Sequence, residues 1–443
     1  MLTPGDRRAG IVAGRETEAG VGAAGGRWAR SARAVGVVAA LGVGLAACSA
    51  APAPAEPAEQ RVEVFTWWAS GSEKLALDAL VRVFAEQHPQ TRFVDAAVAG
   101  GAGSAAKDVL ASRLANDDPP DTFQVHGGAE LAEHVAAGRL TDLEDLFADL
   151  DLAADLPDAV LDAVSVDGVP YAVPSNLHRA NVLWANPQVL ADAGLDPAAG
   201  YATFDDWLAA LATVQASGRT PLAVASTWTQ VHLLEQVLLA RLGPDGYTGL
   251  WDGGTDPGSL EVTAALADFA RLIGYTNDDR DALDWQDAAQ RVAAGQAAFT
   301  VMGDWAFPVL ESAGEHPTWR PVPGTAGTFD LVVDAFTLPV GAPNPQTAEQ
   351  WLRTVASTDA QVVFANAKGG LPATTAASTS DLGTYQREAH FAFRADAVVP
   401  SLAHGSAIGP AELAALTSAV GTFTRGEASV AQLQAALVEA AGG

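Results

Sequence analysis

Along most of the chain, the hydrophobic pattern changes repeatedly between the spacing of a strand and that of a helix. Residues 61–67 are rich in β-branched and aromatic side chains, which predicts a first strand ending at Trp67-Trp68. One apolar face at helical spacing follows and is formed by Leu77, Leu80, Val81 and Phe84. Residues 121–126 predict a second strand. Strand, helix and strand in this order are typical of an α/β fold.

The same alternation continues to the C-terminus. Residues 169–184 and 329–338 have extended patterns, and Thr203 with an acid three residues later is typical of a helix start. Residues 297–302 predict a strand that stops before Asp304. Further helical faces are expected around Phe269, Trp351 and Leu433.

Two extended crossings predict two discontinuous α/β lobes joined by a hinge, with a ligand cleft between them. About 380 residues follow the N-terminal segment, which exceeds one ordinary core. We expect residues 61–172 plus 333–375 in lobe 1, and residues 173–332 plus 376–443 in lobe 2. Ligand sites in open α/β sheets lie beyond the carboxyl ends of the strands. Polar or aromatic residues follow several of these ends: Trp67-Trp68, Gln124 with His126, and Asp304-Trp305.

The N-terminal residues 1–47 have the pattern of a secretory signal. Six Arg precede an uncharged apolar run at 34–47, which is shorter than the about 20 residues of a membrane-spanning helix. The sequence Leu45-Ala46-Ala47-Cys48 resembles a bacterial lipobox, whose cysteine receives a lipid, and Cys48 is the only cysteine. Residues 48–60 are rich in Ala and Pro and predict a flexible linker. We therefore expect a lipoprotein anchored to the outer face of the cell membrane, with a start codon that lies at or after Met1. The alternative is a buried N-terminal helix that ends in an incidental cysteine.

Charge excludes some classes of partner. The chain has 25 basic and 53 acidic residues, a net charge of −28. Without the predicted signal, which holds six Arg and three acids, the net charge is −31. Such a chain repels nucleic acid, and it is not expected to dock on anionic lipid head groups. No Cys cluster and no His-x-x-x-His pattern occurs, so neither a metal site nor a cofactor is predicted.

Several short motifs carry a family resemblance when taken in order. They are Thr66-Trp67-Trp68, the Gly-rich segment 100–103, the segments 119–126 and 173–182, Trp228-Thr229-Gln230 with His232, the segment 301–306, Lys368-Gly369 and the segment 401–405. The chain resembles the sugar-binding components of bacterial ABC importers, the family that includes maltose-binding protein. Within that family it is most similar to the glucose/mannose-type receptors.

The resemblance implies a non-enzymatic, monomeric receptor of the periplasmic-binding-protein type. It would close around one monosaccharide, glucose first and galactose or mannose as alternatives, and deliver it to an ABC permease. The resemblance also implies the residues that touch the sugar. These are Trp67, Trp68, Glu73, Gln124, His126 and Lys368 in the first lobe, Trp228, Trp251, Asp304 and His404 in the second, and Asn176 and His178 near the crossing.

The chemistry of these residues suits a sugar. Tryptophan rings supply flat walls for the apolar faces of a pyranose, while carboxylates and imidazoles bond its hydroxyls. Each tryptophan has a core role as its alternative. Two other functions stay open: an exported glycoside hydrolase or lyase, which needs two suitably spaced acids, and a lipid-anchored structural module without a ligand. A disaccharide ligand also stays open.

Overall fold

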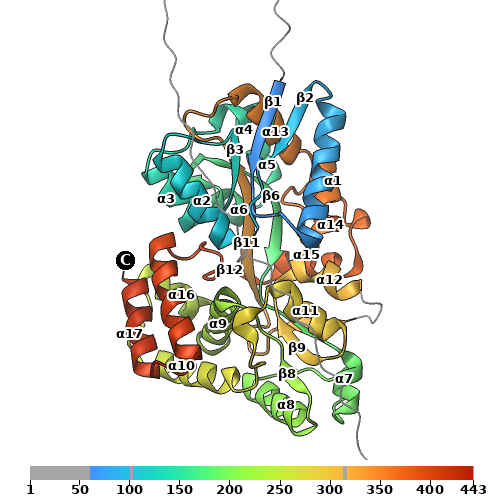
Figure 1. The fold of residues 1–443 in the computed structure, drawn as a ribbon, viewed down its shortest axis with the longest axis vertical. Coiled ribbons are helices and arrows are strands. Elements are labelled where there is room, and N and C mark those ends of the chain that lie inside the picture. The colour runs from blue at the N-terminus through green and yellow to red at the C-terminus, as the bar shows by residue number, and fades with distance from the viewer. Residues whose placement is uncertain (1–59, 100–102, 313–316, 443) are drawn as a thin grey trace, which may run out of the picture. The chain divides into compact units, whose positions relative to one another are not determined.

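The computed structural model describes residues 60–99, 103–312 and 317–442, all within one compact unit that spans Pro57–Gly443 (Figure 1). The predicted signal, Cys48, most of the predicted linker and residues 100–102 of the Gly-rich segment lie outside the described residues. In the part of the chain that is described, no helix combines the length and apolar character needed to cross a membrane.

The first sheet has six strands, and their order is β12-β11-β3-β1-β2, with β6 also paired to β11. Their bounds are β1 Gln60–Phe65, β2 Thr91–Asp95, β3 Thr122–His126, β6 Ala172–Arg179, β11 Thr328–Thr337 and β12 Ala397–Pro400. Strand β1 runs parallel to β2 and β3, whereas β11 runs antiparallel to β3 and β6. The predicted strands at 61–67, 121–126 and 329–338 are therefore present within one or two residues.

Helices surround the first sheet (Figure 1), and large buried rings join some of them to it. These helices are α1 Gly71–Gln87, α2 Ser104–Ala115, α3 Ala129–Ala136, α4 Glu144–Leu150, α5 Leu152–Asp155, α6 Asp158–Ala163, α13 Pro345–Ala356, α14 Thr358–Lys368 and α15 Thr384–Ala395. Helices α1 and α14 lie side by side (Figure 1). Trp351 of α13 meets Phe84 of α1 and Phe336 of β11 edge to face, with ring centroids 5.5 and 5.4 Å apart. The apolar helical face predicted around Trp351 is confirmed, since Trp351 lies on α13 and is fully buried.

The second sheet has four strands in the order β10-β7-β9-β8. Their bounds are β7 Val182–Ala185, β8 Thr220–Leu222, β9 Ala297–Val301 and β10 Thr318–Pro321. The helices that follow or cover it are α7 Pro187–Asp192, α8 Phe204–Ala216, α9 Thr227–Asp252, α10 Leu260–Ile273, α11 Trp285–Ala293, α12 Phe307–Glu311, α16 Pro410–Thr424 and α17 Val430–Ala441. Short elements complete the fold: β4 Ser165–Val166, β5 Val169–Pro170, and the 3₁₀ turns η2 Arg280–Ala282, η3 Asp304–Ala306 and η4 Thr379–Asp381.

Local sequence explains several element boundaries. Helix α8 begins after the capping box that the sequence predicts, because Thr203 accepts from the backbone of Asp206 and Asp206 accepts from the backbone of Thr203. Helix α9 is interrupted at Gly243, which has a positive φ of 68°, and Pro244 follows it. The second half of α9 therefore takes a new direction.

The two sheets are linked by strands that follow one another closely in sequence. Strand β6 belongs to the first sheet and β7 to the second, with only Ala180 and Asn181 between them. Strand β12, which falls in the range predicted for lobe 2, pairs with β11 in the first sheet. The exact division into lobes remains a prediction.

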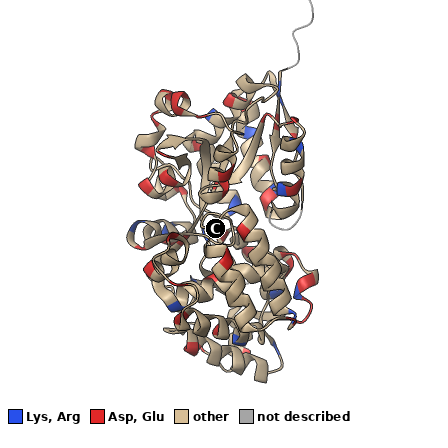
Figure 2. Cartoon of the chain, turned by 90° about the vertical axis from the view of Figure 1, so that its left-hand side faces the viewer, with Lys and Arg blue, Asp and Glu red and all other residues tan. Residues whose placement is uncertain are grey.

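Acidic residues are spread over the helices of both sheets (Figure 2).

Candidate ligand-binding site

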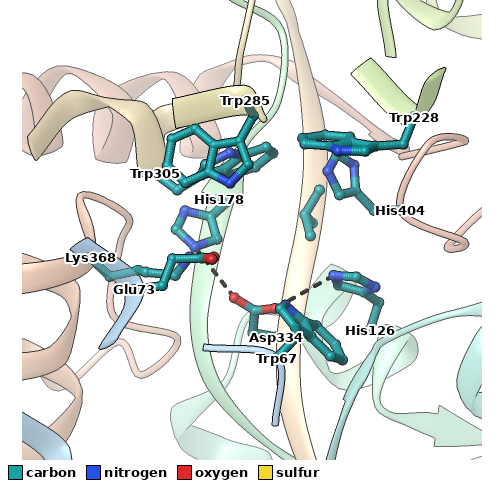
Figure 3. A pocket seen from close by; sticks show the side chains of 11 residues that line it. Trp67, Glu73, His126, His178, Trp228, Trp285, Trp305, Asp334, Lys368 and His404 are labelled. Carbon is teal, nitrogen blue, oxygen red and sulfur yellow. Dashed lines mark hydrogen bonds and ion pairs between the residues drawn. The ribbon is translucent and has the colours of Figure 1, made fainter. Parts of the chain in front are cut away.

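A narrow cavity lies where residues from both sheets converge, and its volume is about 30 Å³ (Figure 3). Its lining residues are Trp67, Glu73, His126, His178, Trp228, Trp285, Trp305, Val332, Asp334, Lys368 and His404. Several of these residues lie at or just beyond the end of a strand or a helix. Trp67 follows β1, Trp305 follows β9 and Lys368 ends α14. The cavity therefore lies at the edge of the sheets where ligand sites are expected.

Asp334 of β11 lies at the floor of the cavity and contacts three neighbours. Its carboxylate accepts a 3.0 Å hydrogen bond from the Gln124 amide, and it lies 3.6 Å from His126 Nε2 and 3.4 Å from His178 Nε2. Burial favours the neutral acid, but the hydrogen bond and charge of His178 and the charges of His126 and Lys368 outweigh it. They lower the pKa of Asp334 to about 2. Asp334 is therefore a charged acceptor in the pocket.

His178 is held in place by buried groups on its far side. Its Nδ1 contacts Asp304, which also accepts from the backbone N–H of Arg179 at 3.0 Å and from the Tyr385 hydroxyl at 3.3 Å. The Asn176 amide lies 2.6 Å from His178 Nε2. Burial lowers the pKa of His178, yet the carboxylates of Asp304 and Asp334 raise it above its ordinary value.

Two lysines carry the positive charge around the cavity, each paired with an acid. Lys368 Nζ lies 2.6 Å from Glu73 Oε1, and its side chain is only 3% exposed. Lys107 Nζ lies 2.6 Å from Glu130, which is also 3.1 Å from His126 Nδ1. Burial raises the pKa of Glu130, but Lys107 and His126 outweigh this effect and lower it to about 2. The chain has only three lysines, so two of them near one cavity mark it as a polar site.

Four tryptophans form the walls of the cavity: Trp67, Trp228, Trp285 and Trp305 (Figure 3). His404 packs edge to face against Trp305 and Trp228, with ring centroids 4.9 and 5.9 Å apart. Two polar atoms here are buried without a protein partner, Trp228 Nε1 and His404 Nε2. Burial, together with the neighbouring histidines His232 and His126, lowers the pKa of His404 well below its ordinary value, so the ring is neutral.

Seven of the twelve ligand-contact residues predicted from the sequence line this cavity: Trp67, Glu73, His126, His178, Trp228, Lys368 and His404. The other five do not line it. Trp68 packs in the core against Phe364, while Gln124, Asn176 and Asp304 bond to the residues that do line the cavity. Trp251 lies beyond the kink of α9, where it packs on Tyr247. Sugar contact remains a prediction for all twelve.

Four lining residues are not among the contacts predicted from the sequence: Trp285, Trp305, Val332 and Asp334. Asp334 carried a signal, because an acid inside the apolar segment Leu331–Phe336 needs a partner or a ligand. Trp305 also carried a signal, because it directly follows Asp304, a predicted sugar contact. Trp285 carried none, because it begins helix α11 like any core aromatic residue. Only its position in the fold brings it to the cavity.

A second cavity of about 520 Å³ adjoins the first and shares His126, Trp228 and His404 with it. Helices α2 and α3 supply its charged side through Lys107, Asp108 and Glu130, and α16 supplies an apolar side. The two cavities thus meet at the His126–His404 contact, where the ring centroids are 5.6 Å apart.

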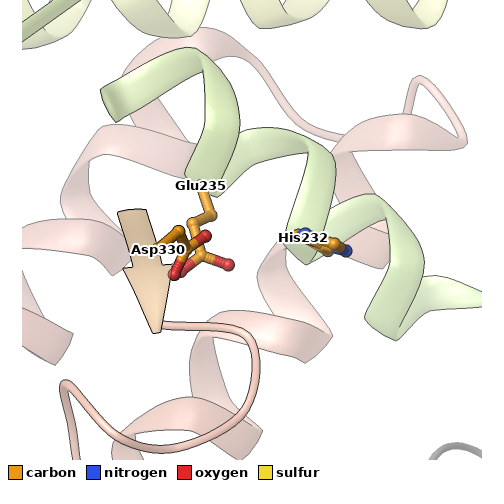
Figure 4. A group of neighbouring side chains, drawn as sticks. All are labelled: His232, Glu235 and Asp330. Atoms are coloured by element: carbon orange, nitrogen blue, oxygen red, sulfur yellow. The ribbon is translucent and has the colours of Figure 1, made fainter. Parts of the chain in front are cut away.

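One buried group among the described residues has the residue types of a metal site. It is formed by His232, Glu235 and Asp330, and its potential ligand atoms lie within 4.8 Å of one another (Figure 4). However, the Glu235 oxygens already accept from four protein groups, and His232 Nε2 lies 3.0 Å from the carbonyl of Ala180. We therefore assign no metal to this group.

Aromatic walls, charged acceptors and unpartnered polar atoms around one small cavity define a receptor for a compact polar molecule. Residues 68–362 match the family of bacterial extracellular solute-binding proteins, and the chain belongs to this family. Proteins of this family are extracellular receptors rather than enzymes. The predicted family is confirmed, and the alternatives of a hydrolase and of a purely structural module are not supported.

Similar proteins cover most of the chain. It is 34% identical over 367 residues to an uncharacterized ABC transporter extracellular-binding protein of Pyrococcus horikoshii, which covers 82% of this chain and 83% of that protein. It is 30% identical over 393 residues to the xylose/arabinose-binding protein XacG of Haloferax volcanii, with 86% and 84% covered. The solved bacterial solute receptor AcbH superposes with a TM-score of 0.75 at 16% identity, over 86% of this chain and 98% of that one. This likeness confirms the predicted periplasmic-binding-protein fold.

Proposed function

We propose that this protein is the sugar-binding component of an ABC importer and that it binds a single hexose ring in the narrow cavity. Glucose is the first candidate, with galactose and mannose as alternatives. The observation that carries the proposal is the composition of the cavity. Tryptophan walls suit the apolar faces of a pyranose, and Asp334, His178 and the Lys368–Glu73 pair suit its hydroxyls. The relative XacG is named for binding xylose and arabinose, which supports the sugar class.

The size of the cavity bears on how the sugar enters. The narrow cavity has a volume of about 30 Å³ and adjoins the larger cavity of about 520 Å³. A hexose needs more room than the narrow cavity alone offers, so we expect its walls to separate when the sugar enters. This favours hinge motion between the two predicted lobes, with the strands β6, β11 and β12 next to the crossing.

Thermal unfolding with a panel of sugars tests the proposal. A ligand that binds only the folded state raises its stability, by about 2.7 kcal/mol when its concentration is 100 times Kd. We expect at least one hexose to raise Tm in this way, and titration calorimetry to give a stoichiometry of one. The panel should include glucose, galactose, mannose, xylose, arabinose and several disaccharides. If no sugar changes Tm, the proposed function is wrong.

The lipid anchor on Cys48 completes the proposed function, because a tether keeps the receptor near its permease. Mass spectrometry of the protein from its own cell membrane should find a diacylglycerol adduct on an N-terminal Cys48. A Cys48→Ala variant should leave the membrane fraction while its purified form still binds the sugar. A wild-type protein recovered without lipid would contradict the anchor alone.

A further inference from the structure

Glu235 of helix α9 lies fully buried behind the wall of the narrow cavity and holds the loop that follows β12. Its Oε1 accepts from the Tyr247 hydroxyl at 2.9 Å and from the backbone N–H of Leu402. Its Oε2 accepts from the Ser401 hydroxyl and from the backbone N–H of Ala403, both at 3.3 Å. Three consecutive residues of the loop are thus bonded to one carboxylate, and the next residue is His404.

Ser401 connects Glu235 to His404. Its Oγ lies 3.3 Å from Glu235 Oε2 and 2.8 Å from His404 Nδ1. A serine hydroxyl has one proton, and a carboxylate can only accept. The Ser401 proton therefore goes to Glu235, which leaves Ser401 Oγ to accept from His404 Nδ1–H. The ring is neutral, so His404 Nε2 then carries a lone pair and no proton, and it is the buried atom without a partner.

The charge of Glu235 depends on Asp330 of β11. Both side chains are fully buried, and an oxygen of each lies within 4.8 Å of the other, so two negative charges there would repel each other strongly. Glu235 accepts from four donors, whereas Asp330 Oδ2 accepts only from Gln236 at 2.7 Å and Oδ1 has no hydrogen-bond partner. The proton therefore belongs to Asp330, and Glu235 keeps its charge.

We propose that Glu235 is a positioning residue for sugar binding: through Ser401 it sets the tautomer of His404, so that Nε2 faces the cavity as an acceptor for a sugar hydroxyl. Asp330 holds a proton and therefore adds no second negative charge beside Glu235. The inference rests on the proposed sugar-binding function. It assigns to His404 the role of accepting a hydrogen bond, where the ring by itself can act either as donor or as acceptor.

The inference carries a pH dependence with opposite signs for affinity and stability. Burial raises the pKa of Glu235 to about 7 and that of Asp330 well above its ordinary value. As pH falls below about 7, Glu235 gains a proton, Ser401 can turn its hydroxyl toward His404, and sugar affinity falls. Because both folded pKa values are raised, the stability that these acids contribute is present at low pH and is lost as pH rises through about 7.

Other titratable groups face this pair. They are His232 and Tyr247 of α9, Arg179 of β6 and His404 of the loop. Burial lowers the pKa of His232 to about 4 and raises that of Tyr247 well above 10, so neither changes charge near neutral pH. A variant that removes only the charge of Glu235 therefore separates the titration of Glu235 from the titration of the pocket histidines.

The test compares Glu235→Gln with wild type in the full chain, using the sugar that raises Tm most. A glutamine amide donates to Ser401, which then donates to His404 Nδ1 and moves the ring proton to Nε2. We expect about a tenfold loss of affinity at pH 8, which corresponds to the loss of about one hydrogen bond. The loss should shrink toward pH 6, where wild-type Glu235 is protonated. The ¹⁵N shifts of His404 should show Nδ1–H in the wild type at pH 8 and Nε2–H in the variant.

Asp121→Asn is the matched control. Asp121 is also buried, and it also accepts from the backbone of two other segments, at Glu63 and Asn344, but it does not line the cavity. This variant should lose stability without losing affinity. If Glu235→Gln fails to fold, Ser401→Ala breaks the same connection with less disturbance and should give the same affinity loss. In a double-mutant cycle, Glu235→Gln should add nothing to the loss caused by His404→Ala.

Several results would overturn the inference. Wild-type affinity in both Glu235→Gln and Ser401→Ala contradicts it, as does a loss that adds fully to that of His404→Ala. A His404 Nε2–H signal in the wild type at pH 8 contradicts the tautomer. One metal ion per chain in the purified protein would also contradict the inference, because the metal would take the place of the proton on Asp330. If the wild type binds no sugar at all, the proposed function fails first, and the ¹⁵N shifts still test the tautomer.

Discussion

At the scale of single residues, Asp334 gives the cavity its charged acceptor. It is the charged acceptor at the floor of the cavity, and its two oxygens contact Gln124, His126 and His178. The sequence identified the residues around it but not Asp334 itself, because its strand has the apolar pattern of a core strand. A buried acid in such a strand needs a partner or a ligand, and this need is the signal that Asp334 carries in the sequence.

Asp334→Asn should weaken sugar binding by about 10- to 150-fold, the range for a hydrogen bond to a charged group. The amide keeps the shape of the side chain but offers one acceptor oxygen and no charge to the sugar and to His178. Isothermal titration calorimetry measures the loss. Glu63→Gln serves as the control, since Glu63 pairs with Arg113 and does not line the cavity. Equal affinities for wild type and Asp334→Asn would remove Asp334 from the site.

The stability of the folded protein at acid pH depends on the same carboxylate, that of Asp334. The pKa values of Asp334 and Glu130 are lowered to about 2, so the stability they contribute is present above their ordinary pKa and is lost as pH falls through about 2. Urea unfolding between pH 5 and pH 2 should therefore show a steeper loss of stability in the wild type than in Asp334→Asn. Parallel curves for the two proteins would mean that Asp334 is not held as a charged group.

At the scale of elements, the observed boundaries agree with the predicted ones where local chemistry controls them. The capping box at Thr203 and the strand ends at residues 65 and 301 lie within two residues of their predicted positions. These features depend on neighbours in sequence, and a single sequence contains them. The kink of α9 is different. Gly243-Pro244 is visible in the sequence, but its effect on Trp251 is not, because the new direction of the helix is a matter of packing.

Thr203→Ala should destabilise the protein by about 1 kcal/mol, because it leaves a backbone N–H of the first turn of α8 without its acceptor. Thr213→Ala in the same helix is the control. Thr213 is exposed and bonds only the carbonyl of Ala209, so alanine there should be neutral or slightly stabilising. Chemical denaturation measures both. Sugar affinity should stay unchanged in both variants, and equal stabilities would mean that the cap contributes nothing.

At the scale of the whole molecule, the cavity exists only because distant segments meet. Lys368 and Glu73 are 295 positions apart, and their pair is part of the cavity wall. Gly369 makes one of these meetings possible. It has a positive φ of 99°, and a Cβ on it would lie 2.4 Å from the carbonyl oxygen of Asp304. The end of α14 can therefore approach η3 closely enough to bring Lys368 to the cavity.

Sugar binding should change the compactness of the protein. The narrow cavity of about 30 Å³ offers less room than a hexose needs, so we expect its walls to open for entry and to close around the bound sugar. Small-angle X-ray scattering should show a smaller radius of gyration with saturating sugar than without it. A sugar that binds tightly with no change in scattering would contradict hinge closure but not sugar binding.

The sequence by itself determined the α/β class, the family, several strand and helix positions and seven of the residues that line the cavity. It did so because hydrophobic spacing, capping and short motifs are local properties of the chain. Only the tertiary structure decided that Trp67 faces the cavity while Trp68 faces the core, and that Trp285 and Asp334 join the site. It also decided that Asp304 contacts His178 from behind the cavity and that Glu235 is connected to His404 through Ser401. These roles depend on which face of an element is covered by segments far away in sequence, and no local pattern contains that information.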